Sequence, residues 1–264
     1  MHTFYSNHSL FSSILHTDNA VMTYFILVVA TLVTSVISGV LSMAGGIILM
    51  GVFGLFLTVP AAMVLHGIAQ AVSNGSRVWL YRHHIRWGVL KYYGAGALAV
   101  LATFAYLQFI PNIGLVFLLI GSFPFLALSL PKSINLDMTI PRVSFSAGIA
   151  VTTAQMLAGA SGPVLDIFYV QSQMNKEEVL GTKALTQTLG HLLKLFYYGA
   201  ILAVAADSVP LWLVPTVVVA AITGNYLASR IVIYMTDTQF RRIGRYVILL
   251  IGAIYMVKGF VELF

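Results

Sequence analysis

Four residues in the apolar segment 180–199 have side chains that could bind or move charge. In the string LGTKALTQTLGHLLKLFYYG they are Lys183, Gln187, His191 and Lys194. On a helix that turns 100° per residue, Lys183, Gln187 and Lys194 fall within about 40° of one another. His191 flanks them at about 80°. One face of this predicted helix therefore carries two cations, an amide and an imidazole, a set of groups suited to an anion.

A second segment carries a related set at the same spacing. His66, Gln70 and Arg77 repeat the arc, and Asn74 lies on its flank. A constant offset of 117 residues aligns His66 with Lys183, Gln70 with Gln187, Asn74 with His191, Arg77 with Lys194, Gly45 with Gly162 and Tyr81 with Tyr198. Because the matches fall on the unusual residues, the sequence predicts a duplicated functional unit.

The composition places these polar faces among lipid. Of the 264 residues, 59% are hydrophobic and only 8% are charged, whereas soluble domains carry about 25% charged residues. The apolar runs do not alternate with polar residues, so they predict helices and not a transmembrane β-barrel. The chain has no cysteine, which excludes disulfides and thiolate metal ligands. The net charge of +6 is explained by basic loops and does not indicate nucleic-acid binding.

The cost of charge in a bilayer decides where these faces point. One charged residue at the bilayer centre costs about 2.5–3.5 kcal/mol, so we expect the polar arcs to face protein or a hydrated cavity. Simpler interpretations stay open for single residues. Lys183 and Arg77 lie near segment ends and could extend to the lipid headgroups. Gln70 and Gln187 could cross-link helices, and the two histidines of the arcs could be structural.

Eight apolar segments must position these residues. They lie at 22–58, 61–81, 88–109, 113–130, 143–173, 178–205, 209–232 and 243–264. Six have a length that suits one crossing of a hydrocarbon core about 30 Å thick. The first is interrupted by SMAGG (42–46) and the fifth by AGASGP (158–163). Since glycine clusters and proline break helices, each is predicted to be a hairpin that enters and leaves on the same side.

The basic loops support this topology. With two hairpins, all ten lysine and arginine residues of the loops fall on one side, predicted to be cytoplasmic, and both termini fall outside. The predicted fold is an all-α integral membrane protein with two inverted repeats, each a broken helix hairpin plus three transmembrane helices. Its parts are an N-terminal tail (1–21), repeat 1 (22–131), a cytoplasmic linker (132–142) and repeat 2 (143–264).

The two breaks contribute donors of their own. Where a helix restarts, near Gly45–Gly46 and Ser161–Gly162, free backbone N–H groups carry partial positive charge. A packing kink is the simpler interpretation of either break. Asp166 is the one acid at this depth. It would either form an ion pair with Lys183 or Lys194 or carry a coupling proton.

Two strings of the sequence carry a family resemblance. LAGASGPVLDIFYV followed by VLGTKALTQTLGHLLKLFYYG resembles the second half of the sulfite exporter TauE/SafE family (the TSUP permeases). LSMAGGIILMGVFGLFLTVP with the RHHIRW loop is similar to the first half, so the resemblance covers about 22–264. It implies a transporter of small sulfur-containing anions, such as sulfite, thiosulfate, sulfoacetate or another organosulfonate, in a bacterial inner membrane. The departure at Met43–Ala44, where this family is richer in glycine, leaves the exact substrate open.

We therefore predict a secondary active transporter that works by alternating access, with no enzymatic activity, no cofactor and no metal. Its partners would be the sulfur anion and the lipid bilayer, without nucleic acid, and Gly94 and Gly96 would allow close helix contact in a homodimer. The predicted binding residues are Gly45, Gly46, His66, Gln70, Asn74, Arg77, Ser161, Gly162, Lys183, Gln187, His191 and Lys194, with Asp166 for coupling.

Three alternatives come from other functional classes. A cation or metal carrier would use the seven histidines. A rhomboid-like intramembrane serine protease would use Ser161, in the string GASG, with His191 as its base. An accessory protein would not transport at all. The direction of transport and the coupling ion are left open by the sequence.

Overall fold

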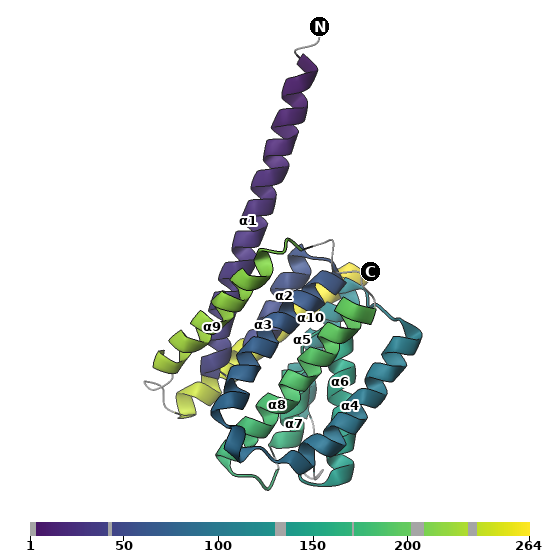
Figure 1. Cartoon of the computed structure of the whole chain (residues 1–264), viewed down its shortest axis with the longest axis vertical. Helices are drawn as coiled ribbons and strands as arrows, with labels where there is room; N and C mark the ends of the chain where they lie inside the picture. The colour runs from purple at the N-terminus through teal and green to yellow at the C-terminus, as the bar shows by residue number, and fades with distance from the viewer. Residues whose placement is uncertain (1–3, 42–43, 130–135, 171, 202–208, 232–236) are drawn as a thin grey trace.

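In the computed structural model, the described part of the chain consists of helices joined by loops and contains no strand (Figure 1). The structure describes the backbone of all residues except 1–3, 42–43, 130–135, 171, 202–208 and 232–236, and the side chains of 20–39, 44–129, 136–170, 172–200, 209–231 and 245–264. In order, the helices are α1 (Phe4–Leu41), α2 (Ala44–Phe56), α3 (Val59–Leu80), η1 (Arg82–His84), α4 (Trp87–Leu107), α5 (Ile113–Ser129), α6 (Pro141–Ala158), α7 (Gly162–Tyr169), α8 (Lys176–Leu195), η2 (Phe196–Ile201), α9 (Leu213–Ile231) and α10 (Asp237–Leu263).

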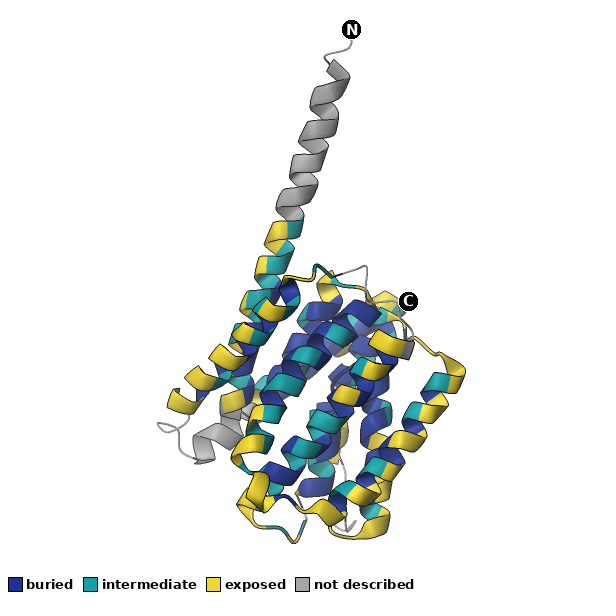
Figure 2. Ribbon diagram, viewed as in Figure 1, coloured by how far each residue is buried: buried dark blue, intermediate teal, exposed yellow. Residues whose placement is uncertain are grey.

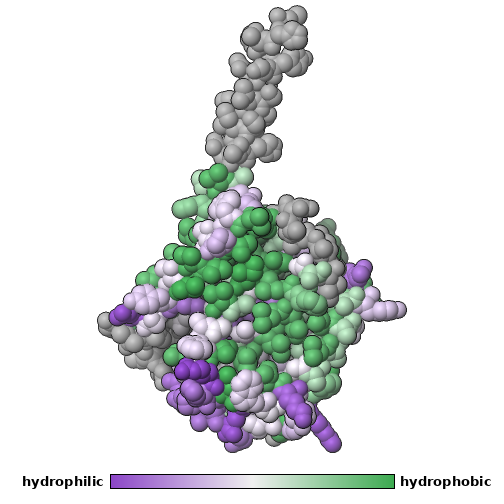
Figure 3. All heavy atoms as spheres, in the orientation of Figure 1, coloured by the Kyte–Doolittle hydropathy of each residue, from purple (hydrophilic) through white to green (hydrophobic). Residues whose placement is uncertain are grey.

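Apolar helices dominate this arrangement, as the composition predicts. In the described part, three helical stretches are long and apolar enough to cross a membrane: Ala20–Gly39, Trp87–Leu107 and Arg245–Leu263. Helices α2 and α5 are apolar but shorter. Figure 3 shows hydrophobic atoms across the middle of the visible face and hydrophilic atoms gathered at its lower end. The all-helical prediction is therefore confirmed for the described residues, and the apolar helices suit a membrane protein.

Both interruptions of the long apolar segments are present as helix breaks. Helix α1 ends at Leu41 and α2 begins at Ala44, while α6 ends at Ala158 and α7 begins at Gly162. Gly159 ends α6 in the left-handed conformation, with φ of 75°, and its amide donates to the carbonyl of Gln155. Glycine adopts this conformation without strain. Residues 42 and 43, where Met43 distinguishes the first break, lie outside the described residues.

The helix boundaries differ from the predicted segment boundaries at three places. Helix α1 already begins at Phe4, so most of the segment 1–21, predicted as a separate tail, continues the first apolar helix and extends away from the bundle (Figure 1). The predicted linker 132–142 lies partly outside the described residues, and α6 begins within it at Pro141. The apolar run 178–205 contains the end of α8 followed by the π-helix η2.

The helices pack in pairs that relate the two halves of the chain. The most extensive contacts join α5 to α10, α1 to α9, α4 to α6 and α3 to α8. If α1–α5 are exchanged with α6–α10 in order, the pairs α3–α8 and α5–α10 map onto themselves, and α1–α9 maps onto α4–α6. Helices α2, α3, α7 and α8 bring buried residues to the centre of the bundle (Figure 2).

Small residues allow the closest of these contacts. A Cβ atom added to Gly148 of α6 would collide with the carbonyl oxygen of Tyr93 in α4, and one added to Gly96 of α4 would collide with the carbonyl of Phe145. Membrane helices use small residues for close backbone approach because packing, and not the hydrophobic effect, holds them together. The α4–α6 pair therefore has no room for a methyl group at either glycine.

We expect Gly148→Ala to lower the midpoint of thermal unfolding by several degrees, because overpacking costs about 1–3 kcal/mol and the colliding atom is backbone. Thermal unfolding of the detergent-solubilised chain, followed by tryptophan fluorescence, measures this. The matched control is Gly88→Ala in α4, where an added Cβ has no neighbour within 4 Å. An unchanged midpoint in Gly148→Ala would contradict the packing described here.

Candidate functional site

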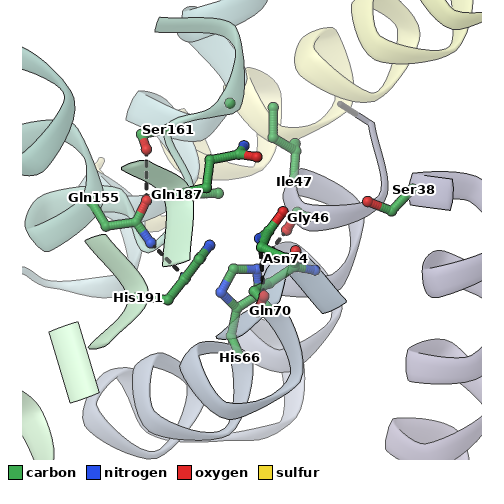
Figure 4. A pocket seen from close by; sticks show the side chains of 12 residues that line it. Ser38, Gly46, Ile47, His66, Gln70, Asn74, Gln155, Ser161, Gln187 and His191 are labelled. Carbon is green, nitrogen blue, oxygen red and sulfur yellow. Dashed lines mark hydrogen bonds between the residues drawn. The ribbon is translucent and has the colours of Figure 1, made fainter. Parts of the chain in front are cut away.

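A pocket lies where α3, α8 and the two helix breaks meet (Figure 4). Its walls come from the end of α1, the start of α2, the middle of α3, the end of α6, the α6–α7 break and the middle of α8. The residues that line it are Ser38, Gly46, Ile47, His66, Gln70, Asn74, Gln155, Ala160, Ser161, Gly162, Gln187 and His191. No lysine, arginine or carboxylate is among these lining residues.

Corresponding positions of the two halves line the pocket together. The offset of 117 residues relates Gln70 to Gln187 and Asn74 to His191, and all four side chains lie in the wall. It also relates Ser38 of α1 to Gln155 of α6. The pocket therefore lies between equivalent surfaces of the two halves of the chain.

A network centred on Gln155 fixes one side of the pocket. The Gln155 amide nitrogen donates to the carbonyl of Gly159 at 3.0 Å and to Nδ1 of His191 at 2.8 Å. Its oxygen accepts from the Ser161 hydroxyl at 2.6 Å. Because the carbonyl of Gly159 can only accept, the amide orientation is determined. Nδ1 of His191 is then an acceptor, which leaves the neutral ring with its N–H at Nε2.

A second network connects the two breaks through α3 and α8. Nε2 of His66 donates to the carbonyl of Gly46 at 2.8 Å, so its Nδ1 is an acceptor in the neutral ring. Lys194 Nζ donates to that Nδ1 and to the carbonyl of Gly159, at 2.8 Å each. Both side chains are fully buried. Nearby, the Tyr198 hydroxyl donates to the carbonyl of Met156 at 2.7 Å.

Two amides in the pocket wall have no partner of their own. The side chains of Gln70 and Gln187 form no hydrogen bond with the residues that the structure describes. Asn74 differs, because its amide nitrogen donates to the backbone carbonyl of Gln70 at 2.9 Å. Gln70 and Gln187 are therefore the side chains most available to a bound molecule.

Three basic residues that were predicted to bind an anion lie outside the pocket lining, namely Arg77, Lys183 and Lys194. Lys183 forms an ion pair with Asp166 of α7, which is one of the two partners that the sequence suggests for this acid. Arg77 reaches Ser38, with Nη2 at 3.4 Å from Oγ. Lys194 is covered by His66. Their side chains therefore do not line the pocket.

The predicted residues therefore separate into lining and supporting sets. Gly46, His66, Gln70, Asn74, Ser161, Gly162, Gln187 and His191 line the pocket, whereas Gly45, Arg77, Lys183 and Lys194 do not. Gly45 instead lies against α1, where an added Cβ would collide with the carbonyl of Thr34. The sequence reasoning missed Ser38, Ile47, Gln155 and Ala160. The offset of 117 residues between the polar positions Ser38 and Gln155 is the signal that could have found that pair.

The pocket offers hydrogen-bond donors to a small molecule with several acceptor atoms. Besides the two free amides and the His191 N–H, the starts of α2 and α7 lie in its wall at Gly46 and Gly162, and helix starts carry partial positive charge. The pocket is narrow in this conformation: the centre of a water molecule has about 20 Å³ in which to move, which suits one ordered water. A larger guest requires the walls to separate.

The serine and histidine of the protease alternative do not contact each other as a catalytic dyad requires. Gln155 stands between them, accepting from Ser161 and donating to His191. A serine nucleophile is activated by a hydrogen bond to its base, and here that bond goes to an amide. Among the described residues, no group of three or more histidine, cysteine or acidic side chains is placed to hold a metal ion.

Comparison with known proteins gives the decisive observation. The model of the family described as "Sulfite exporter TauE/SafE" matches residues 27–256. The chain belongs to this family. The resemblance seen in the sequence is thereby confirmed, and the TauE/SafE assignment makes the chain a membrane-embedded transporter of sulfur anions such as sulfite. No curated protein and no solved structure matches the chain.

Two adjacent glycines of the TauE/SafE chain separate the effects of packing and of pocket volume. In Gly45→Ala the new methyl collides with α1, so we expect a thermal midpoint several degrees below wild type. In Gly46→Ala the nearest atom is a side-chain atom of Gln70 at 3.6 Å, so the methyl fits but narrows the pocket. We expect a wild-type midpoint with about tenfold weaker uptake of sulfur anions, because the pocket has no spare volume.

Thermal unfolding and uptake of ³⁵S-labelled anions into proteoliposomes measure the two effects. The reverse pattern, with Gly46→Ala unstable and Gly45→Ala stable but inactive, would show that the pocket is misplaced.

Proposed function

We propose that this chain is a secondary active transporter that moves small sulfur-containing anions across a bacterial inner membrane by alternating access. Sulfite, thiosulfate, sulfoacetate and other organosulfonates form the substrate class. The observation that supports this most directly is the pair Gln70 and Gln187. Their amides are free, they occupy equivalent positions in the two halves, and they line one pocket between two restarting helices.

The chemistry of the pocket favours an anion over a cation. Its free polar groups include the amide N–H groups of Gln70 and Gln187 and the Nε2–H of His191. Each oxygen of a sulfite or sulfonate group can accept from such donors. No carboxylate lines the pocket, and Asp166 is neutralised by Lys183. The positive ends of α2 and α7 add to the same field.

Neutral donors also suit release of the substrate. A cation in direct contact with the anion would form a strong, charge-assisted pair. Here Arg77, Lys183 and Lys194 lie behind the wall and already have partners. The anion would contact only neutral donors, and it would exchange these hydrogen bonds for hydrogen bonds with water when it leaves. A transporter has to release its substrate in every cycle, so moderate binding is an advantage.

The packing of the helices supports two inverted repeats and an alternating cycle. The exchange of α1–α5 with α6–α10 conserves the main contacts, as two units related by a pseudo-two-fold axis require. The units would be 22–131 and 143–264, each with one broken hairpin and three further helices. The pair α3–α8 is its own counterpart and carries the free amides. Rocking of the two units about this contact would open the pocket to either side in turn.

The basic residues give the orientation in the proposed membrane. Arg82 and Arg86 lie in the loop between α3 and α4, at the lower end of Figure 1, together with the loop between α7 and α8. Positive residues are enriched on the cytoplasmic side, so this end would face the cytoplasm. The loops between α2 and α3 and between α4 and α5 would then face the outside.

The prediction that tests this function replaces the free amides. We expect Gln187→Ala and Gln70→Ala to fold like wild type but to take up ³⁵S-labelled anion at least tenfold more weakly, because a hydrogen bond to a charged group contributes about 1.5–3 kcal/mol. Uptake of sulfite, thiosulfate and sulfoacetate into proteoliposomes measures this. The matched control is Gln173→Ala, in the exposed loop before α8, which should transport normally.

Two results would overturn the proposal. If folded wild-type protein takes up none of the three anions, the proposed substrate class is wrong. If both glutamine variants take up the anions normally, the chain is a transporter but the proposed binding site is wrong.

A further inference from the structure

Lys194 is a fully buried lysine whose partners are neutral. Its Nζ donates to the carbonyl of Gly159 and to Nδ1 of His66, at 2.8 Å each, and its side chain has 0% exposure. The ion pairs found among the described residues do not include it. A buried ammonium without a countercharge costs several kcal/mol. Lys194 therefore needs either a nearby anion or the loss of its proton.

The hydrogen bonds of Lys194 match the neutral amine. An ammonium has three N–H donors, whereas the amine has two. Within the described part of the chain, Nζ has two acceptors, the carbonyl of Gly159 and Nδ1 of His66. While the pocket holds no anion, the amine has both donors satisfied. The third donor of the ammonium would have no acceptor among these residues.

His66 places Lys194 directly behind the pocket. The imidazole lines the pocket and accepts from Nζ through Nδ1. An anion in the pocket would therefore lie on the other side of this ring, separated from Nζ by one side chain in the interior of the protein. Attraction between opposite charges is strong in such a low-dielectric environment. The anion would supply the countercharge that Lys194 lacks.

We propose that Lys194 takes up one proton when the anion binds and returns it when the anion leaves, so that one proton crosses the membrane with each substrate. The step is a proton transfer alone: the lone pair of Nζ takes a proton from a hydronium ion of the solvent, so that one N–H bond forms, one O–H bond breaks and a water molecule is released. Binding and protonation then favour each other by the same factor. This inference rests on the proposed function, because it requires an anion in the pocket.

The histidines are the nearest competing proton acceptors. The rings of His66 and His191 lie 5.4 Å apart, and both already use their acceptor nitrogen. Nδ1 of His66 accepts from Lys194, and Nδ1 of His191 accepts from Gln155. A proton placed on either nitrogen would break an existing hydrogen bond. The lone pair of Lys194 is free of that cost.

The other titratable groups on the elements around α8 are already engaged or lie further along it. Tyr197 and Tyr198 of η2 donate to the carbonyls of Phe109 and Met156. On α3, Arg77 donates to Ser38. Tyr169 of α7 forms a hydrogen bond with Thr186, and Asp166 of α7 is paired with Lys183 of α8. The remaining buried group is Tyr93 of α4.

The experiment measures anion binding by the full-length protein in detergent as a function of pH. Sulfite, thiosulfate and sulfoacetate serve as separate probes. Thiosulfate and sulfoacetate are fully deprotonated near pH 7, because their acid groups titrate well below this pH, so any proton that accompanies them there is carried by the protein. For wild type we expect Kd to rise with pH, towards a limit of tenfold per pH unit. Weakly buffered protein should take up at most one proton per bound anion.

Three variants identify the group that titrates. Lys194→Met should bind more weakly and lose both the pH slope and the proton uptake. Lys194→Arg keeps a permanent charge and should bind at all pH values without a slope, which also covers the case that the methionine variant does not fold. His191→Gln keeps an acceptor but changes a residue of the pocket wall, so its affinity should fall while the slope remains.

The outcomes separate this inference from the function on which it rests. Anion binding by wild type without proton uptake would overturn the role of Lys194 and leave the transporter intact. A slope that survives in Lys194→Met or Lys194→Arg, or that disappears in His191→Gln, would assign the proton to another group. Absence of binding for all three probes in folded protein would overturn the function and this inference together.

Discussion

The carbonyl groups at the α6–α7 break are the constraint on which the site depends. Irregular backbone within a membrane must be satisfied by protein or by water in a cavity. Here the carbonyl of Gly159 accepts from Gln155 and Lys194, and the carbonyl of Met156 accepts from Tyr198. Three polar side chains in the centre of an apolar bundle are thus explained by two carbonyls that the end of α6 leaves free.

The same side chains determine which groups face the pocket. Because Gln155 is held by Gly159, it presents its oxygen to Ser161 and fixes the tautomer of His191. Because Lys194 is held by Gly159 and His66, its amino group does not line the pocket. Among the described residues, the polar groups of the pocket that remain free are neutral, namely the amides of Gln70 and Gln187 and the Nε2–H of His191. The backbone break therefore organises both the rigid support of the site and its available donors.

The sequence predicts the polar arcs well, because helical periodicity and the offset of 117 residues are properties of the chain alone. It also locates both breaks, since glycine and proline act locally. It cannot separate lining from supporting residues. Lys183 and Gln187 lie on one arc, yet Lys183 forms an ion pair with Asp166 of α7 whereas Gln187 lines the pocket. That difference depends on which helix packs opposite each position. The hydrogen bonds of Gln155 depend in the same way on the packing of α6 against α8 and the α6–α7 break.

The two halves of the chain differ at the position of the buried basic residue. Lys194 corresponds to Arg77 by the offset of 117 residues, but a guanidinium stays protonated in proteins whereas a lysine amine can lose its proton. Arg77 donates to the hydroxyl of Ser38, the counterpart of Gln155, while Lys194 bonds a backbone carbonyl directly. The two equivalent positions thus carry different basic groups, and only the lysine can lose its proton. An exchange of conformation between the halves would therefore change the surroundings of one titratable cation, which a proton-coupled cycle requires.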